Sequence, residues 1–221
     1  HHYVDTNVSL LAGISTSPGF QKFHPFLRGD GASSVPITVL HSPNPGSGFD
    51  TGELFFSFGA WHSQASSVGA WVPTGFRRAD NSTVMLSIAF GNNDEHVLQQ
   101  LLTGSGWSAP ADMTSISGGP KAESSVSGYE RSDGLNVIVY PRFPDFHIEE
   151  IAFTGGAWHA GDLTQNAGAP AALGGGDLYP YVRADGVNSV PFATEDGHVY
   201  DLFLSGGAWH FLDLTVNATS A

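Results

Sequence analysis

Hydrophobic residues along this chain recur in short runs that end in glycine, asparagine or aspartate. One such run covers residues 197–204 (GHVYDLFL) and another covers residues 209–215 (WHFLDLT). Both are rich in aromatic and β-branched side chains, and short runs bounded by turn residues predict β-strands. No window sustains the 3.6-residue period of an amphipathic helix. The pattern therefore predicts an all-β protein in which no helix is longer than a turn or two.

A repeat of about fifty residues runs through the chain. The sequence Gly-Ala-Trp-His and its variants place tryptophans at spacings of 46, 51 and 51: Trp61, Trp107, Trp158 and Trp209. Eight residues before each tryptophan stands a carboxylate or an amide: Glu53, Gln99, Glu150 and Asp201. Further upstream lies a pentad of the form aromatic-x-Arg-x-Asp, with Arg28, Arg78, Arg131 and Arg183 at its centre. Because four of the six arginines share one register, the repeat is not a coincidence.

Each repeat is predicted to form four short antiparallel strands. The first strand carries the pentad and ends in a residue suited to a tight turn with positive φ: Gly31, Asn81, Gly134 or Gly186. The second strand begins at Ser34-Val35, Thr83-Val84, Asn136-Val137 or Ser189-Val190. Tandem four-stranded units of this length predict one β-propeller domain with four blades, at residues 20–66, 67–115, 122–165 and 176–216. Residues 1–7 resemble a fourth strand and predict an extra outer strand, which would favour a homo-oligomer.

Composition narrows the partners of the chain. The formal net charge of its 221 residues is -13, which disfavours nucleic acid and anionic membrane surfaces. No apolar run approaches the ~18 residues of a membrane span, so we expect no membrane insertion. Cysteine is absent, which excludes disulfides and thiolate chemistry. A secreted or extracellular location is favoured over a cytoplasmic one.

The repeated residues allow a structural and a functional interpretation. Each tryptophan could pack between blades, or its indole face could stack on the apolar surface of a sugar. The pentad aromatics are expected in the core: Phe26, Phe76, Tyr129 and Tyr181. Residues i and i+2 of a strand share a face, so each pentad Arg should point the same way as its Asp, as Arg28 does with Asp30. These could be structural ion pairs, or the guanidinium could meet vicinal hydroxyls with Glu53, Gln99, Glu150 or Asp201 as acceptor.

Catalytic and metal-binding motifs are not evident. The six repeated histidines are too dispersed for a compact metal site, and we expect them to be exposed or hydrogen-bonded: His62, His159, His210, His96, His147 and His198. Asp162 and Asp213 should cap the ends of strands. The chain contains no phosphate-binding loop, nucleophile elbow or His-Glu-x-x-His sequence. Its repeated carboxylates differ from the single pair that a glycosidase uses, so we expect a non-enzyme without metal or cofactor.

The combination of these motifs resembles a known group of proteins. The order aromatic-x-Arg-x-Asp-Gly, then residues 196–202 (DGHVYDL), then Gly-Ala-Trp-His resembles the blades of fucose-specific-lectin-like propellers and, more loosely, tectonin-type lectins. In fucose-binding members each site lies between adjacent blades and uses an Arg, a Glu and aromatic residues. Their Glu resembles Glu53 and Glu150, and Gln99 and Asp201 stand in the same register. Where their Arg stands, this chain has Ser34, Thr83, Asn136 and Ser189, so the resemblance implies sugar binding without specifying fucose.

The resemblance and the repeat together predict a lectin with several glycan sites and with glycans or glycoproteins as partners. The predicted ligand-binding residues are the repeated arginines, acceptors and tryptophans: Arg28, Arg78, Arg131, Arg183, Glu53, Gln99, Glu150, Asp201, Trp61, Trp107, Trp158 and Trp209. A hemopexin-like protein-interaction scaffold and a propeller glycosidase are the alternatives.

Overall fold

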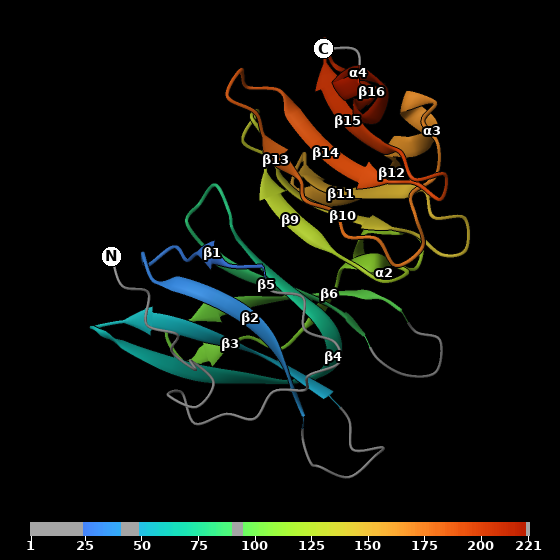
Figure 1. The fold of residues 1–221 in the computed structure, drawn as a ribbon. Helices are drawn as coiled ribbons and strands as arrows, with labels where there is room; N and C mark the ends of the chain where they lie inside the picture. Colours follow the sequence, from blue (N-terminus) through green and yellow to red (C-terminus); the bar gives the residue numbers. More distant parts are fainter. Residues whose placement is uncertain (1–23, 41–48, 90–94, 220–221) are drawn as a thin grey trace.

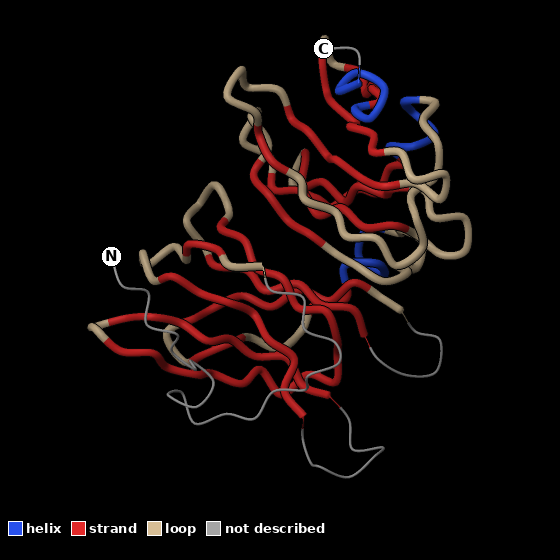
Figure 2. Tube along the Cα trace, in the orientation of Figure 1, coloured by secondary structure: helices blue, strands red, loops and turns tan. Residues whose placement is uncertain are grey.

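The computed structural model describes residues 24–40, 49–89 and 95–219, and strands dominate this part of the chain (Figure 1, Figure 2). The predicted extra strand at residues 1–7 lies outside the described residues. The described helices have five or six residues each: α2 (Met113–Ser117), α3 (Leu163–Ala167) and α4 (Leu214–Thr219). The expectation of an all-β protein with only short helices is confirmed.

The strands form four consecutive antiparallel meanders, the blades of a β-propeller. Blade 1 contains β1 (Phe26–Leu27), β2 (Ser33–Leu40), β3 (Phe49–Ser57) and the first part of β4 (Ala60–Arg77). Blade 2 contains the second part of β4 with β5 (Thr83–Ala89), β6 (Val97–Thr103), β7 (Gly106–Trp107) and β8 (Ala111–Asp112). Strand β4 pairs with β3 as far as Gly69 and with β5 from Ala70, so one strand belongs to both blades.

Blades 3 and 4 are separate four-stranded sheets. Blade 3 contains β9 (Ser127–Glu130), β10 (Asn136–Pro141), β11 (Ile148–Thr154) and β12 (Ala157–Asp162). Blade 4 contains β13 (Tyr181–Val182), β14 (Asn188–Ala193), β15 (Val199–Ser205) and β16 (Ala208–Asp213). Figure 1 shows blades 1 and 2 in the lower left and blades 3 and 4 in the upper right. The first strand of each blade contacts the first-strand region of its neighbour.

The turn after each pentad has the predicted backbone. The residues Gly31, Asn81, Gly134 and Gly186 all have positive φ, between 65° and 84°. The register of the second strand differs from the prediction in two blades. Phe26 pairs with Ser34, whereas Phe76 pairs with Val84, so Val35 and Val84 are not equivalent. Blade 1 has one more residue between turn and valine than blade 2, and the turn sets the register.

Short helices link the later blades: α2 lies between blades 2 and 3, and α3 lies between blades 3 and 4. Asp112 and Asp162 cap the N-termini of α2 and α3, and a left-handed glycine ends each helix, as is common for C-caps. Each aspartate also binds a histidine at the start of the third strand, with His96 Nδ1 at 2.7 Å and His147 Nδ1 at 2.8 Å. Asp162 thus caps at the end of its strand as predicted, but the element it caps is the following helix. His96 and His147 are hydrogen-bonded, as predicted. Blade 1 has no such helix because β4 continues directly into blade 2.

Two contacts recur between adjacent blades, the first at two junctions and the second at all three. The aromatic ring of a pentad packs on a glycine of the next blade, Phe26 on Gly75 and Phe76 on Gly128, where a Cβ atom would approach the ring to 2.1 Å and 2.3 Å. The N–H after the pentad arginine donates to a side chain at the start of the next blade's second strand. These bonds join Gly29 to Thr83 (2.9 Å), Ala79 to Asn136 (3.0 Å) and Ser132 to Asn188 (2.8 Å).

The predicted burial of the pentad aromatics fails in blade 4. Phe76 and Tyr129 are buried and Phe26 is half-buried, but the side chain of Tyr181 is exposed. The ring of Tyr181 belongs to the last blade of the described chain, so no following glycine covers it. Nearby, Tyr179 stacks on His24 of blade 1 with ring centroids 5.3 Å apart. The pentad aromatics are therefore buried or half-buried where another blade follows, and exposed in blade 4.

Candidate functional site

The pentad arginines bind the predicted acceptors of their own blade. Arg28 Nη1 lies 3.0 Å from Glu53 Oε1, and Arg131 Nη1 lies 3.0 Å from Glu150 Oε1. In blade 2, Arg78 Nη2 donates to Gln99 Oε1 at 2.6 Å. These three pairs place side chains from the first turn against the third strand of the same blade.

The fourth blade departs from this arrangement. The positive charge of Arg183 acts on Asp201, but the hydrogen bond that holds Asp201 comes from Ser189, at 2.5 Å. Aspartate is one methylene shorter than glutamate, and the Arg183 guanidinium is directed instead to Asp185, at 2.8 Å. The equivalent register of Asp201 with Glu53 is confirmed by the strand pairing, since each lies opposite a proline of the second strand.

The Arg–Asp pairs within the pentads form in three blades. A turn, rather than a shared strand face, brings the two side chains together. Arg28 binds Asp30, and Arg131 Nη2 lies 2.6 Å from Asp133 Oδ2. The first strands end before the arginine, so the predicted common strand face is not what brings the charges together. In blade 2, Asp80 accepts hydrogen bonds from the backbone and the hydroxyl of Ser82 at 2.9 Å and 2.6 Å.

Burial and charge shift the pKa values of these groups. Burial raises the pKa of the Glu53 carboxyl, while Ser34 and Arg28 act in the opposite direction. Burial also raises the pKa of Glu150, and it lowers the pKa of Arg78, whose partner Gln99 carries no charge. Hydrogen bonds from Ala32 and Arg28 outweigh burial at Asp30 and hold the pKa of that carboxyl below its usual range.

Two of the repeated tryptophans, Trp107 and Trp158, approach the acceptor or the arginine of the preceding blade. The Trp107 indole N–H lies near Glu53 and stabilises its carboxylate without reaching hydrogen-bond geometry. The Arg78 guanidinium lies over the Trp158 ring, 5.4 Å from its centroid. All four predicted tryptophans are half-buried: Trp61, Trp107, Trp158 and Trp209. At the first and second junctions, the arginine–acceptor pair of one blade thus lies beside the tryptophan of the next blade.

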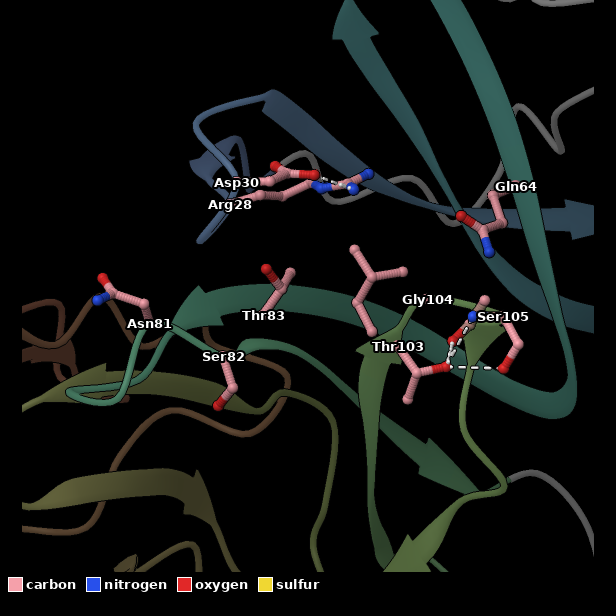
Figure 3. Close-up of a pocket in the computed structure, with 11 residues that line it drawn as sticks. Arg28, Asp30, Gln64, Asn81, Ser82, Thr83, Thr103, Gly104 and Ser105 are labelled. Carbon is pink, nitrogen blue, oxygen red and sulfur yellow. Dashed lines mark hydrogen bonds and ion pairs between the residues drawn. The ribbon is translucent and has the colours of Figure 1, made fainter.

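The first junction, between blades 1 and 2, contains a cavity of about 500 Å³ (Figure 3). Blade 1 contributes Arg28, Asp30 and Gln64 to its wall. Blade 2 contributes the turn residues 81–83 and the β6–β7 turn, residues 102–106. Figure 3 shows Arg28 and Asp30 on one side, with Thr83, Ser82 and Thr103 on the other. Hydroxyl, amide and charged groups thus converge on a space large enough for a small polar ligand.

The second and third junctions carry larger residues at the equivalent places. Strand pairing aligns Ser82 of blade 2 with Leu135 of blade 3 and Val187 of blade 4. Leu135 packs against the apolar core cluster that contains Tyr129 and Val137. At the first junction a hydroxymethyl group stands where the other two have branched hydrocarbon side chains.

Sequence reasoning did not identify several residues of this cavity. It singled out Arg28 as a binding residue and Asp30 only as its partner, and it missed Gln64, Ser82 and Thr103. The available signal was the exchange of Leu135 and Val187 for Ser82 after each turn. Glu53 was predicted as an acceptor for ligand, but its side chain is fully buried beneath Arg28.

Two further observations bear on the chemistry of the described residues. Among residues 24–40, 49–89 and 95–219, no group of three or more histidine, cysteine, aspartate or glutamate side chains is arranged to hold a metal ion. In the same ranges, no helix is long and apolar enough to cross a membrane.

Known structures with the same fold include sugar-binding proteins and glycosidases. A variant of the Aleuria aurantia lectin in complex with Fucα1-6GlcNAc is 16% identical, with a TM-score of 0.62 over 90% of this chain and 63% of that chain. The lectin SapL1 in complex with α-methyl fucoside is 15% identical, with a TM-score of 0.58 over 92% of this chain and 65% of that chain. A Hadza microbial sialidase is 13% identical, with a TM-score of 0.60 over 86% of this chain and 45% of that chain.

These similarities establish the β-propeller fold of the chain. The chain spans less than two thirds of the length of each of these three proteins. No family model matches the sequence, and no curated protein sequence matches it.

Proposed function

We propose that this chain is a carbohydrate-binding lectin that catalyses no reaction and binds glycans at its blade junctions. The observation that carries the proposal is the polar cavity at the first junction, where Arg28 and Asp30 face hydroxyl groups of blade 2. A sugar presents several hydroxyls that both donate and accept hydrogen bonds. A guanidinium, a carboxylate, two amides and four hydroxyls around one cavity complement such a ligand.

Unpartnered donors support the same interpretation. In each of the three junctions the arginine Nε atom is buried and has no hydrogen-bond partner among the described residues: Arg28, Arg78 and Arg131. A buried donor without a partner is costly, so a ligand hydroxyl that reaches it after a shift of the guanidinium gains affinity. We therefore propose sites at all three junctions, with Arg183 and Asp201 forming half of a site at the end of the array.

The charge balance favours uncharged sugars. At the first junction Arg28 carries one positive charge, while Glu53 and Asp30 carry two negative charges, and both carboxylates bind that guanidinium. An acidic sugar would therefore meet net repulsion. Hydrolysis is disfavoured too, because Glu53 is fully buried and the pKa of Asp30 is low, whereas a glycosidase needs a carboxylic acid that protonates the leaving oxygen.

The test combines a glycan array with calorimetry. We expect binding to neutral glycans, weak binding to sialylated or uronic-acid glycans, and no release of free sugar. Arg28→Gln should weaken binding at the first junction at least tenfold, whereas Arg183→Gln, a matched change in a half-site, should have less effect. Circular dichroism of both variants separates lost binding from lost folding. Binding to no glycan, or release of free sugar, would overturn the proposal.

A further inference from the structure

The turn between β3 and β4 carries an exposed aromatic residue in an unfavourable backbone conformation. Phe58 and Gly59 are its two central residues, with φ of 51° and 80°, and Ser57 pairs with Ala60 across the turn. Two-residue turns with positive φ at both positions favour asparagine and glycine. The other three blades have glycine at this place: Gly104, Gly155 and Gly206.

Phe58 opposes folding in two ways at this position. A side chain in the left-handed region is unfavourable relative to glycine, and the effect is largest for bulky residues. The Phe58 ring is also fully exposed, so it recovers no burial energy in return. A residue that is both strained and solvent-exposed points to a function at the site rather than to the fold.

Phe58 lines a second cavity, of about 380 Å³, beside the first. Phe56, which is partly exposed, and Ser57 form the wall together with Gly31 and Ala32 of the β1–β2 turn. Asp30 lines both cavities, so the β1–β2 turn is a ridge between them. One side of this ridge is polar and the other side is aromatic.

We propose that one neutral oligosaccharide crosses this ridge, with one sugar in the first-junction cavity and a second sugar stacked on Phe58. This inference rests on the proposed function and extends it from a single sugar to a linear glycan. The Asp30 side chain is about half exposed, and besides its bonds to Arg28 and Ala32 its oxygens retain capacity to accept from hydroxyls on either side.

The two cavities divide the recognition between them. The polar cavity selects the pattern of hydroxyls, because its wall carries Arg28, Gln64 and Thr103. The Phe58 ring offers an apolar face that matches the C–H surface of a pyranose and makes few demands on its hydroxyls. The negative charge of Asp30, which lines both cavities, disfavours acidic sugars in each of them. The site therefore recognises an oligosaccharide of at least two neutral units.

The test replaces Phe58 by the residue of the other blades. Phe58→Gly should fold at least as stably as the parent chain, because it relieves the strain at φ 51°. Two probes are titrated: the strongest neutral oligosaccharide from the glycan array, and the methyl glycoside of the sugar unit that fills the polar cavity. We expect Phe58→Gly to weaken the oligosaccharide about tenfold and to leave the affinity for the methyl glycoside within twofold.

A matched control places a phenylalanine in the same turn of blade 4. Gly206→Phe should reduce stability and leave the affinity of the first junction for both probes unchanged. Equal affinities of parent and Phe58→Gly for the oligosaccharide would overturn the inference while leaving the lectin proposal intact. Self-association of the parent chain that Phe58→Gly abolishes would also overturn it, because Phe58 would then bind another copy. Absence of binding to every glycan would instead defeat the proposed function itself.

Discussion

The first and second junctions share one framework and differ in what fills it. In both, a pentad arginine binds an acceptor of its own blade and a backbone N–H donates to the next blade. The first junction combines this framework with a carboxylate acceptor and small polar neighbours. The second has an amide acceptor and a leucine at the place of Ser82. The comparison teaches that the repeat specifies how blades join, whereas a few side chains beside the joint decide how much space is left for a ligand.

The largest expected difference concerns the acceptors. Glu53→Ala leaves the buried Arg28 without its principal partner, so it should cost about 3–5 kcal/mol of unfolding free energy. Gln99→Ala removes an uncharged acceptor from the half-buried Arg78 and should cost about 1–3 kcal/mol. Urea unfolding of both variants measures the two values. Equal losses would show that charge adds nothing at the first junction.

The next largest effect on stability should come from the close packing of blade 1 against blade 2 at Gly29. A Cβ atom on Gly29 would lie 1.7 Å from the backbone oxygen of Asn81, which leaves no room for any side chain. Gly29→Ala should therefore cost about 1–3 kcal/mol, as overpacking usually does. The reverse change at the second junction, Ala79→Gly, should cost less than about 1 kcal/mol because residue 79 is exposed. Thermal unfolding compares the two, and a neutral Gly29→Ala would contradict the tight joint.

Exchanging the side chains at positions 82 and 135 should exchange the binding properties of the first and second junctions. Ser82→Leu copies Leu135 into the first junction, and we expect it to weaken glycan binding there about tenfold, or about 1.4 kcal/mol. Leu135→Ser should widen the second junction and strengthen binding there, at some cost in stability, since Leu135 packs on the core. Calorimetric stoichiometry and affinity provide the measurement. Unchanged binding by Ser82→Leu would place the ligand elsewhere.

The smallest expected effect is a difference in pH dependence. The pKa of Glu53 is raised in the folded chain, so folding favours the protonated carboxyl. This contribution to stability is fully present below the unfolded pKa and is lost as the pH rises through the folded value. The slope should stay well below the limit of about 1.4 kcal/mol per pH unit. Glu53→Gln should remove it, whereas Gln99→Glu should introduce a similar slope. Urea unfolding at pH values from 4 to 7 measures how the unfolding free energy of each variant depends on pH. A steeper decrease in Glu53→Gln than in the parent chain would contradict the raised pKa of Glu53.

Much of the fold and part of the site could be predicted because repetition aligns equivalent residues. Arg28 and Asp30 pair as one of the two predicted alternatives, since the two positions recur at fixed spacing in every blade. The additional pairing of Arg28 with Glu53 was not predicted. The approach of Trp107 to Glu53 could not be predicted, because spacing within a blade says nothing about which neighbour lies alongside. The exposure of Tyr181 follows from having no further blade beside it in the described chain, which its local sequence does not record. Phe58 escaped notice because strain at φ 51° is a property of the backbone.

The backbone N–H groups that follow the pentad arginines all donate in one direction, toward the next blade, although the Asn188 side chain donates back to Ser132. Gly29, Ala79 and Ser132 each donate to the following blade, and none of these three bonds is reciprocated by a backbone donor from that blade. Each blade thus has a donating side and an accepting side, like units of a polymer with a defined head and tail. An inserted blade would bring its own donor N–H and its own acceptor side chain. It would therefore form the same hydrogen bonds with the two blades that it separates. The contacts between blades therefore permit duplication of a blade to lengthen such an array, or loss of a blade to shorten it, without redesign of the remaining contacts.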